Sequence, residues 1–404
     1  MKNSICGILF CSLLLVACKD KPVVTTALPV FDLEKEYAER PLLFQDIADV
    51  EYVPLETTDE SVVSGVAFVS MDEKNIVIYD SRTSSFVVFD RLGKFQKAFC
   101  HKGESGEEYR NTNGMAVDFK AREIYTFDYG AFAPSRIQVY DFEGRYVRTL
   151  DIPEWTLLKI RNYDEEYLFA EDVTYVDTES RDKARKQPYY LVSKQTGEMK
   201  QLPLYVKERE GSGLLWKVTD DGNNTKFSTS IYFPNYPISS SGERIFIADF
   251  GLDTIYTYYK DRLEPIAVKQ NRLTKHGSTV MTEVCAQTDR YLLLCTGDKR
   301  LQDGNPPSIP DPQYLLYDYQ SGGINRVILE NADGITYKDI FENLSAMPHC
   351  ALGDFPAGYA LTSFRPSFLL EKHEKGELKG SLKEIASKLD VEDNPVLAII
   401  KFKE

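Results

Sequence analysis

One unit recurs along this 404-residue chain and limits the folds open to it. The unit is a short apolar strand that ends in an acid or close to one, a turn, a second strand, a turn with glycine or an acid, and a third strand. Its six copies, the last of them interrupted, cover residues 75–99, 123–153, 166–204, 244–268, 290–329 and 358–403. A period of this length indicates a repeat architecture, because one such unit cannot bury its apolar faces alone.

Another strand precedes several of the copies, which raises the unit to four strands. These additional strands are expected at 65–72, 114–120, 155–163 and 280–287. The strand that contains Ile245, Phe246 and Ile247 is apolar on both faces, as expected for a sheet enclosed between two neighbouring sheets. Four-stranded sheets packed radially form a β-propeller. We therefore predict an all-β fold, a six-bladed β-propeller of four-stranded blades.

The sixth copy lacks a strand, and the N-terminal part of the chain offers one. The segment 49–57, "DVEYVPLET", reads as a strand without a repeat of its own. We predict that it pairs with the strand at 397–403 and closes the sixth blade. Such closure removes the open sheet edges that favour aggregation.

A helical insertion is expected at about 367–393, within the sixth copy. The pattern is clearest over 376–390, where apolar residues recur at helical spacing. They are Leu378, Leu382, Ile385 and Leu389. Ser381 and Glu384 have the spacing of a capping box. A lid packed on one face of the propeller is the simplest role for this insertion.

The first residues have the character of an export signal. Lys2 is followed by an apolar run over 5–17, which is too short to span a bilayer and typical of a secretory signal. The run ends at Ala17 and Cys18, which resembles a bacterial lipobox, where the cysteine is lipidated after cleavage. The alternative is an ordinary signal peptide with an incidental cysteine.

These features predict the domain organisation and the location of the protein. We expect a lipoprotein signal peptide over 1–17, a lipidated Cys18 with a tether over 18–40, and the propeller over 41–404. The protein is then extracytoplasmic and held by its lipid at a membrane, which we expect to be the outer membrane. The sequence leaves open whether it faces the periplasm or the cell surface.

Charge and cysteine content narrow the partners and the redox chemistry. The net charge is −14 and the pI is near 5.0, which argues against nucleic acid as a partner, because phosphates require a basic surface. Cys285 and Cys295 flank a predicted hairpin. Both a disulfide and two buried thiols fit this spacing, and packing as small apolar residues is the preferred interpretation.

The chain resembles a family of six-bladed β-propeller lipoproteins of uncharacterised function from anaerobic gut-type bacteria, with NHL- and TolB-like propellers as more distant relatives. The resemblance rests on "LFQDIADVEYVPLET" (43–57), "FVVFDRLGKFQKAF" (86–99), "CHKGESGEEY" (100–109) and "NPVLAIIKFK" (394–403). It implies the propeller fold and export, and it implies no chemistry. Glu107 stands where the family has proline, so this connection is expected to be less rigid.

Motifs that would indicate a particular reaction are missing from the sequence. It contains no GxxxxGK[ST], GxSxG or HExxH pattern, and its four histidines do not have the spacing of metal ligands. We therefore expect no cofactor, although Ca²⁺ or Zn²⁺ at the central channel belongs to the alternative given below. The glycines around Gly93 and Gly106 are interpreted as turn residues that do not bind phosphate.

Acids recur directly after the second strand of successive units. They are Asp80, Asp128, Asp172 and Asp249. Two interpretations remain open, a ring of acids around a central pocket or carboxylates that each accept backbone N–H groups at their own turn, and the second is preferred. The candidate residues for a central ligand-binding pocket are Arg82, His101, Asp128, Tyr129, Asp249 and Arg365.

Two functions of different classes follow. The first is a binding or scaffold protein that recognises a peptide, a glycan or a protein partner on a propeller face. The second is a propeller enzyme, such as a lyase, a lactonase or a glycan-active hydrolase, with a metal at the central channel. Only analogy of fold supports the second.

Overall fold

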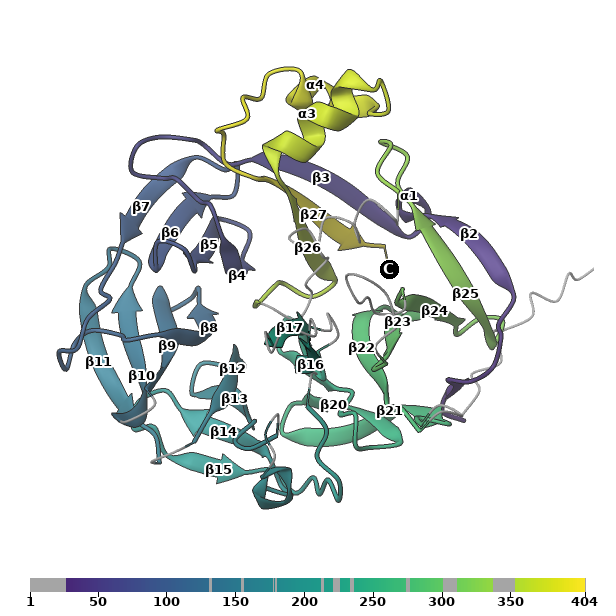
Figure 1. Ribbon diagram of the computed structural model, residues 1–404, viewed down its shortest axis with the longest axis horizontal. Coiled ribbons are helices and arrows are strands. Elements are labelled where there is room, and N and C mark those ends of the chain that lie inside the picture. Colours follow the sequence, from purple (N-terminus) through teal and green to yellow (C-terminus); the bar gives the residue numbers. More distant parts are fainter. Residues whose placement is uncertain are drawn as a thin grey trace, which may run out of the picture.

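Six β-sheets stand around a common axis like the blades of a propeller (Figure 1). The computed structural model describes residues 27–130, 133–153, 156–176, 178, 180–211, 214–220, 226–232, 236–273, 277–300, 311–336 and 353–403. The predicted six-bladed, all-β fold is confirmed.

Blades 1, 2 and 3 are antiparallel four-stranded sheets whose strands follow one another in the chain, from the inside of the ring outwards. Blade 1 consists of β4 (Val66–Met71), β5 (Asn75–Asp80), β6 (Ser85–Asp90) and β7 (Phe95–Phe99). Blade 2 consists of β8 (Thr112–Asp118), β9 (Glu123–Gly130), β10 (Ala133–Asp141) and β11 (Tyr146–Asp151). Blade 3 consists of β12 (Leu158–Asn162), β13 (Tyr167–Asp172), β14 (Tyr189–Ser193) and β15 (Met199–Gln201), with the 3-10 turn η1 (Arg181–Lys183) between β13 and β14.

Blades 4 and 5 repeat this plan, and blade 6 joins the two ends of the chain. Blade 4 consists of β18 (Ile238–Ser241), β19 (Arg244–Ile247), β20 (Thr254–Tyr259) and β21 (Arg262–Gln270). Blade 5 consists of β22 (Val280–Gln287), β23 (Tyr291–Asp298), β24 (Gln313–Asp318) and β25 (Gly323–Glu330). In blade 6 the described strands are β26 (Tyr359–Phe364), β27 (Val396–Phe402) and β3 (Ala48–Pro54), while residues 337–352 lie outside the described part.

The ring closes as expected, by pairing of the N-terminal strand with the C-terminal strand. β27 is antiparallel to β3 over seven residue pairs, from Val396 opposite Pro54 to Phe402 opposite Ala48. The short helix α1 (Phe44–Ile47) leads directly into β3. The outer strand of blade 6 therefore comes from the N-terminal end of the propeller. The ring cannot open there unless the hydrogen bonds between β27 and β3 break.

The segment that precedes β3 also contributes strands to the ring. β1 (Val30–Asp32) pairs in parallel with β21, and β2 (Glu39–Leu43) pairs in parallel with β25. Both add a fifth strand to the outer edge of a blade (Figure 1). Part of the stretch expected to act as a tether, from residue 30 onward, thus lies along the propeller and covers two outer strands.

Strand direction gives the propeller two distinct faces. In each antiparallel blade the turns from strand one to two and from strand three to four lie on one side, which we call the turn face. The turns from strand two to three and the crossings between blades lie on the other side, the crossing face. β3 leads into a crossing between blades, so it ends on the crossing face. Its antiparallel partner β27 therefore starts on that face, and β26, which is antiparallel to β27, ends there. β26 therefore runs in the direction of a second strand.

Apolar packing between neighbouring blades forms the core. Ile76, Val87 and Phe89 of blade 1 pack with Leu397 and Ile399 of blade 6, and equivalent clusters fill the other spaces between blades. Both faces of each central strand are buried, which explains the loss of alternation in the sequence. At about 25 cal/mol per Å² of apolar surface, this burial is the main stabilising contribution.

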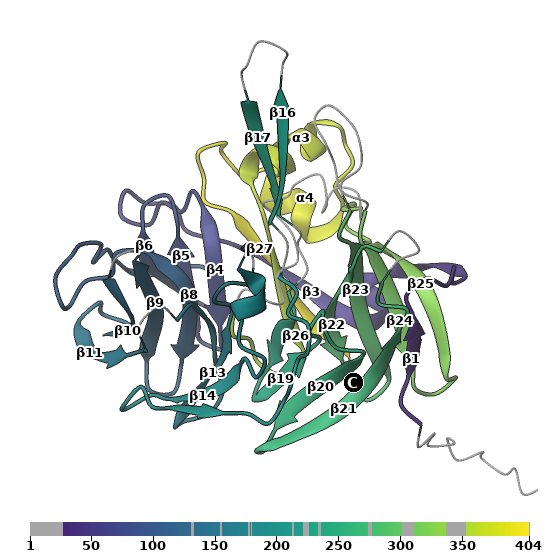
Figure 2. The same ribbon diagram turned by 60° about the horizontal axis from the view of Figure 1, so that its bottom comes forward.

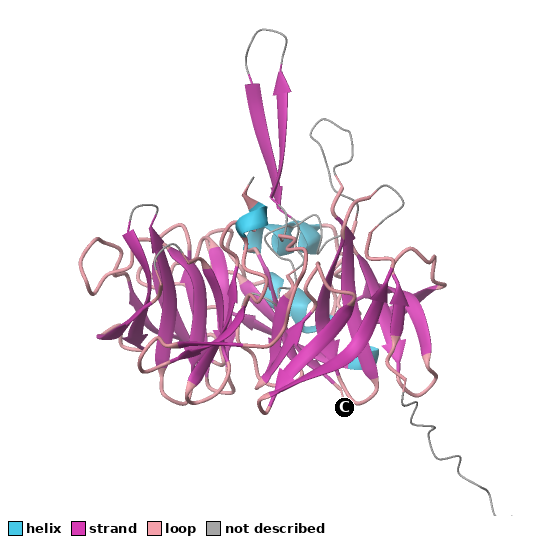
Figure 3. Cartoon of the chain, turned by 90° about the horizontal axis from the view of Figure 1, so that it is seen from below, coloured by secondary structure: helices cyan, strands magenta, loops and turns pink. Residues whose placement is uncertain are grey.

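Two insertions rise from the crossing face. The hairpin of β16 (Leu214–Asp220) and β17 (Lys226–Tyr232) occupies the crossing between blades 3 and 4 and projects from the ring (Figure 2). The helices α3 (Pro366–Glu374) and α4 (Gly380–Ala386) separate β26 from β27 and lie on the same side of the ring (Figure 3). Among the helices that the structure describes, none is sufficiently long and apolar to cross a membrane.

The predicted insertion is confirmed, but the helix at 376–390 is shorter than expected. Gly376 and Gly380 have positive φ values of 72° and 55°, so α4 begins only at Gly380. Lys379 is its N-cap and no side chain caps the helix, so the predicted capping box is wrong. Leu378 and Leu382 are buried against blade 6, and Ile385 and Leu389 pack beside them, as the apolar pattern indicated.

Glycines in the turn between the third and fourth strands let neighbouring blades approach each other. Gly93 has a φ of +83°, and a Cβ atom there would lie 2.3 Å from the carbonyl oxygen of Pro54 in blade 6. Gly144 repeats this arrangement against Phe99 of blade 1. The position thus excludes other residues by both its backbone angle and its contact. Gly106, in the crossing, has no positive φ, and a Cβ atom added there would meet nothing within 4 Å.

The first prediction compares these two glycines. Gly93→Ala should lower the free energy of unfolding by about 3 kcal/mol, because it combines a strained backbone with a steric clash at the seam that closes the ring. Gly106→Ala is the matched control and should change it by less than about 0.5 kcal/mol. Urea denaturation measures both. Equal effects of the two substitutions would contradict the role given to Gly93.

Candidate functional site

The turn face has a cavity at the mouth of the central channel, which we call the mouth cavity. Its volume is about 550 Å³, within the range of small-molecule and peptide-side-chain sites. The turns between the first and second strands of blades 1 to 4 surround it. They contribute residues 71–74, 117–120, 162–165 and 242–243, and residues 354–356 cross it from blade 6.

Three of these turns have an aspartate at or just after the end of the first strand, and each of these residues shapes its own turn. Asp72 Oδ1 accepts the N–H groups of Lys74 and Asn75, at 2.8 and 2.6 Å. Asp164 Oδ1 accepts two amides in the same manner, and Asp118 Oδ1 accepts that of Ala121. These carboxylates fix the turns locally, as aspartate commonly does.

A buried lysine joins two of the turns. Lys194, only 1% exposed, reaches from blade 3 and donates to Asp118 Oδ2 at 2.6 Å and to the carbonyl oxygen of Asp164. A buried charge needs such a partner, since its transfer out of water is costly. The acid in the blade 2 turn is therefore neutralised, whereas Asp72 and Asp164 bind no cation among the described residues.

The mouth cavity is strongly acidic. Seven carboxylates and two lysines line it, and one of those lysines, Lys120, is paired with Glu165. Glu73 and Glu243 are exposed at the rim on different blades. Burial raises the pKa of the Tyr163 hydroxyl; the Asp261 amide that donates to it acts in the opposite direction, and the carboxylates of Asp261, Asp164 and Glu243 raise the pKa further. The lining also includes Phe119, which makes the cavity suited to an organic cation.

The floor of the cavity is a short segment that we call the strap, residues 353–358. Asp354 lies at its centre, and its two carboxylate oxygens accept the N–H groups of Val117 in blade 2 and Asn162 in blade 3, both at 3.0 Å. Its own amide donates to Ser70 Oγ, and its carbonyl oxygen accepts the N–H of Met71, both in blade 1. One residue thus connects the inner strands of three blades.

The rest of the strap connects to blade 4. Ser240 Oγ donates to the carbonyl oxygen of Gly353 at 3.2 Å, and the Gly242 amide donates to that of Phe355 at 2.9 Å. A Cβ atom at Gly353 would lie 1.5 Å from the carbonyl oxygen of Val69, so only glycine fits there. The strap is therefore held rigidly against four blades.

Buried charged groups lie near the strap. Burial raises the pKa of Asp354 to about 6, although the Arg161 guanidinium and the two bonded amides act in the opposite direction. Burial also raises the pKa of Glu283, on the inner strand of blade 5, to about 8, against the effects of the Tyr236 amide and Arg161. Arg161 itself is fully buried, and burial lowers its pKa. The channel thus holds a low-dielectric cluster with a cation at its centre.

The residues proposed from the sequence lie on the other side of the ring. Arg82 and Arg365 line a second cavity of about 390 Å³ between blades 1 and 6, which we call the seam cavity. His101 lies between blades 1 and 2, where its ring stacks on Tyr140 with centroids 5.1 Å apart and its Nε2 donates to the Gly144 carbonyl oxygen at 2.6 Å. Tyr129, near the end of β9, packs against the core between blades 2 and 3.

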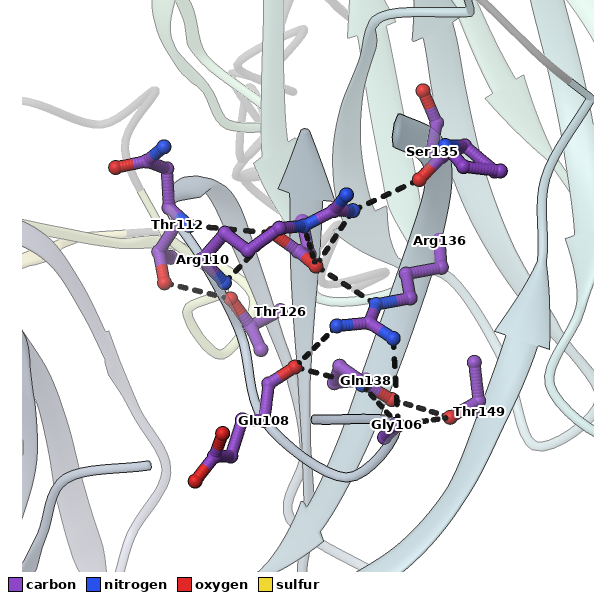
Figure 4. Close-up of polar contacts among 12 residues, drawn as sticks. Gly106, Glu108, Arg110, Thr112, Thr126, Ser135, Arg136, Gln138 and Thr149 are labelled. Atoms are coloured by element: carbon purple, nitrogen blue, oxygen red, sulfur yellow. Dashed lines mark hydrogen bonds and ion pairs between the residues drawn. The ribbon is translucent and has the colours of Figure 1, made fainter. Parts of the chain in front are cut away.

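The crossing 100–109, which carries His101, is fixed by side chains of β10 (Figure 4). Arg136, Gln138 and Tyr140 alternate along the strand and so share one face. Arg136 donates to the carbonyl oxygen of Glu108 at 2.6 Å, Gln138 to that of Gly106 at 2.8 Å, and Tyr140 to that of Glu107 at 2.6 Å. Three consecutive carbonyl groups of this loop thus accept hydrogen bonds from β10, which hold the loop against blade 2.

The recurring acids after the second strands bind backbone at the crossing face. Asp128 accepts the amides of Arg110 and Asn111, together with the guanidinium groups of Arg110 and Arg136. Burial acts to raise the pKa of Asp80, but four backbone N–H groups outweigh it and hold that pKa below its usual range.

The other two acids after second strands follow the same pattern. Asp172 accepts the Thr174 amide, and Asp249 accepts the Gly251 amide and the Tyr189 hydroxyl. Asp172 and Asp249 thus bind amides of their own turns, Asp80 binds amides of its own turn and of the incoming crossing, and Asp128 binds amides of the incoming crossing. Of the six candidate pocket residues, the structure brings only Arg82 and Arg365 together.

Sequence reasoning overlooked the acids of the turn face. The signal was present, since "MDEKN", "VDFKARE" and "NYDEEY" each place an aspartate at or just after the end of a first strand. The acids after the second strands drew attention because they end longer apolar runs. Strand order alone could have assigned the two sets to opposite faces.

The described part of the chain also bears on metal binding and on the state of the cysteines. There, no group of three or more His, Cys, Asp or Glu residues is arranged to hold a metal ion. Cys295 is buried and Cys285 is half-buried beside the core between blades 5 and 6, and both are thiols, not members of a disulfide. Cys18, expected to carry lipid, lies outside the described residues.

Comparison with known proteins places the chain among uncharacterised propellers. A family profile described as a domain of unknown function, DUF4934, matches residues 28–401. No curated protein matches the chain.

Solved structures resemble the chain at low sequence identity. A Bacteroides fragilis protein named as an exported protein is 14% identical, with a TM-score of 0.59, over 94% of this chain and 100% of that one. A Bacteroides thetaiotaomicron protein of unknown function is 11% identical, with a TM-score of 0.38, over 88% and 76% of the two chains. The first supports the propeller fold and nothing further.

The second prediction concerns the buried Glu283. Folded Glu283 keeps its proton up to about pH 8, whereas the unfolded chain releases it near 4.5, so the folded state binds more protons within that window. Its contribution to the free energy of unfolding must therefore fall as the pH rises from 4.5 to 8. Glu283→Gln removes this pH-dependent loss of stability. The melting temperature of the variant should therefore rise relative to that of wild type as the pH increases. A difference that stays constant between pH 5 and pH 9 would refute the assignment.

Proposed function

We propose, from the premise that this chain belongs to the DUF4934 family, that it is an extracytoplasmic, lipid-anchored binding protein. Its mouth cavity takes a positively charged group of a peptide or protein partner. The observation that carries this proposal is the acidic 550 Å³ cavity where the inner turns of four blades meet. Propellers commonly present such a central site to a partner, although the fold alone does not define it.

The charge of the cavity selects the ligand class. Apart from the pairs Asp118–Lys194 and Glu165–Lys120, five carboxylates and one lysine line the cavity, so an anion would be repelled and a cation attracted. Glu73 and Glu243 are exposed and stand on blades 1 and 4, so a cation between them would meet carboxylates from two sides. A lysine or arginine side chain also has an apolar stem that fits against Phe119 and Tyr163.

Rigidity of the site favours binding. The strap and the Asx turns fix the backbone around the cavity through hydrogen bonds to four blades. A site whose groups are already ordered loses little entropy when a ligand enters. The cavity is therefore a preformed receptor for a side chain and does not need to close around it.

The lipid anchor rests on the N-terminal segment. An apolar run over 5–17 ends in Ala17-Cys18, and the propeller starts with β1 at Val30. Few residues separate the expected lipid from the first strand, and an extended chain spans at most about 3.5 Å per residue. The propeller is thereby held close to a membrane, for which we favour the outer membrane.

The third prediction tests the binding site. The double variant Glu73→Gln, Glu243→Gln should bind tetralysine at least tenfold more weakly than wild type in titration calorimetry at low salt, because two rim charges are lost. Glu264→Gln, an exposed acid on blade 4 outside the cavity, is the matched control. Wild-type affinity in the double variant, or an equal loss in the control, would refute this site.

The fourth prediction tests the anchor. Cys18→Ala should move the protein from the membrane fraction to the soluble fraction and abolish incorporation of labelled fatty acid, because no acyl chain can then be attached. Retention of the variant in the membrane fraction would show that Cys18 is not the anchor.

A further inference from the structure

The seam cavity lies on the crossing face, opposite the mouth cavity. Its volume is about 390 Å³, and four segments form it, two from blade 1 and its incoming crossing and two from blade 6. We propose that this cavity binds a carboxylate-bearing ligand, with Arg82 and Arg365 as the residues that recognise the carboxylate. The proposal is independent of the mouth cavity.

The two arginines come from equivalent positions in adjacent blades. Arg82 lies in the turn between the second and third strands of blade 1, and Arg365 directly follows β26, the second strand of blade 6. Both are exposed and both line the cavity. Two arginine side chains that line one cavity favour a planar anion, since a guanidinium group can donate two parallel hydrogen bonds to a carboxylate.

The backbone and the aliphatic stem of Arg82 are held in place by its surroundings. Its backbone N–H donates to Asp80 Oδ1 at 2.7 Å. The stem packs on Gly65, where a Cβ atom would lie 2.8 Å from Arg82 Cγ. Arg82 makes no ion pair with a described residue. Its charge is therefore available to a ligand, while its stem is positioned by the crossing.

The start of helix α3 adds positive potential to the same cavity. Arg365 is the N-cap, Pro366 is the first helical residue, and no side chain caps the nine-residue helix. The first turn of a helix carries N–H groups without intrahelical acceptors and the positive end of the dipole. Ser367, in this turn, lines the cavity. The start of the helix adds to the positive potential of the two arginines. It would not define a site alone.

Apolar and acidic groups limit the remainder of the ligand. Val62 and Val391 are 48% and 57% exposed, which is high for large apolar residues, and both line the cavity. Glu392 and Asp393 also line it, and Asp393 Oδ2 accepts the Asp390 amide at 2.7 Å, which ties it to its own turn. A ligand that joins a carboxylate to a short aliphatic or ring portion fits this lining. The C-terminus of a peptide and a uronic acid share this chemistry.

Calorimetric titration of the full chain with three probes tests the proposal. The probes are N-acetyl-Val-Val, its C-terminal amide and galacturonic acid. At least one of the two carboxylates should bind, and the amide should bind at least tenfold more weakly than the parent peptide. Binding of the peptide acid identifies a peptide terminus as the source, and binding of galacturonic acid alone identifies a sugar acid.

Variants assign the binding to the two arginines. Arg82→Gln and Arg365→Gln should each weaken the carboxylate at least tenfold, while Arg262→Gln, an exposed arginine of blade 4, should leave it unchanged. Melting temperatures confirm that the exposed substitutions leave the fold intact. The mouth-cavity variant Glu73→Gln, Glu243→Gln should bind the carboxylate as wild type does. This control distinguishes a failure of the seam-cavity proposal from a failure of the mouth-cavity proposal. Absence of carboxylate binding, equal binding of the amide, or unchanged binding in both arginine variants would overturn the proposal.

Discussion

The carboxylate of Asp354 fixes the centre of this propeller. Packing between blades is apolar and non-directional, so it brings the sheets together without setting their relative height. Asp354 sets it, because its two oxygens bind amides of blades 2 and 3 while its own backbone binds blade 1. Hydrogen bonds to a charged group contribute about 1.5–3 kcal/mol each, and a buried amide left without its acceptor costs a comparable amount. The mouth cavity takes its floor from this residue.

Aspartate performs two different tasks on the two faces of the ring, and the position in the repeat decides which. After a second strand, the carboxylate is consumed by the incoming crossing, as at Asp80 and Asp128. After a first strand, one oxygen shapes the turn, as at Asp72 and Asp118, and the second oxygen of Asp118 binds the Lys194 ammonium group. A repeated acid therefore fixes the backbone on the crossing face, whereas it contributes negative charge on the turn face.

Much of the fold could be predicted because its causes are local or periodic. The repeated strand patterns gave the blades, and the unpaired strand at 49–57 gave the closure between β3 and β27. The helix boundaries were missed because Gly376 and Gly380 adopt positive φ in this context, which the apolar spacing does not encode. The hairpin of β16 and β17 escaped because it belongs to no repeat.

The site was harder to predict, since it depends on which turns share a face and on contacts between distant segments. Arg82 and Arg365 were selected from the sequence and line one cavity, although they are 283 residues apart in the chain. His101 was selected with them, yet it stacks on Tyr140 between two blades. Asp354 gave no signal, because its role arises only when blades 1, 2 and 3 are brought to it by the closed ring.

Hydrogen–deuterium exchange with and without bound tetralysine tests most directly whether the mouth of the ring is the binding site. The account predicts slower exchange in peptides that span the turns at 71–74, 117–120 and 162–165 and the strap, with no change at the crossing 100–109. Protection confined to the crossing face, or no protection in any of these segments while the ligand is bound, would contradict it.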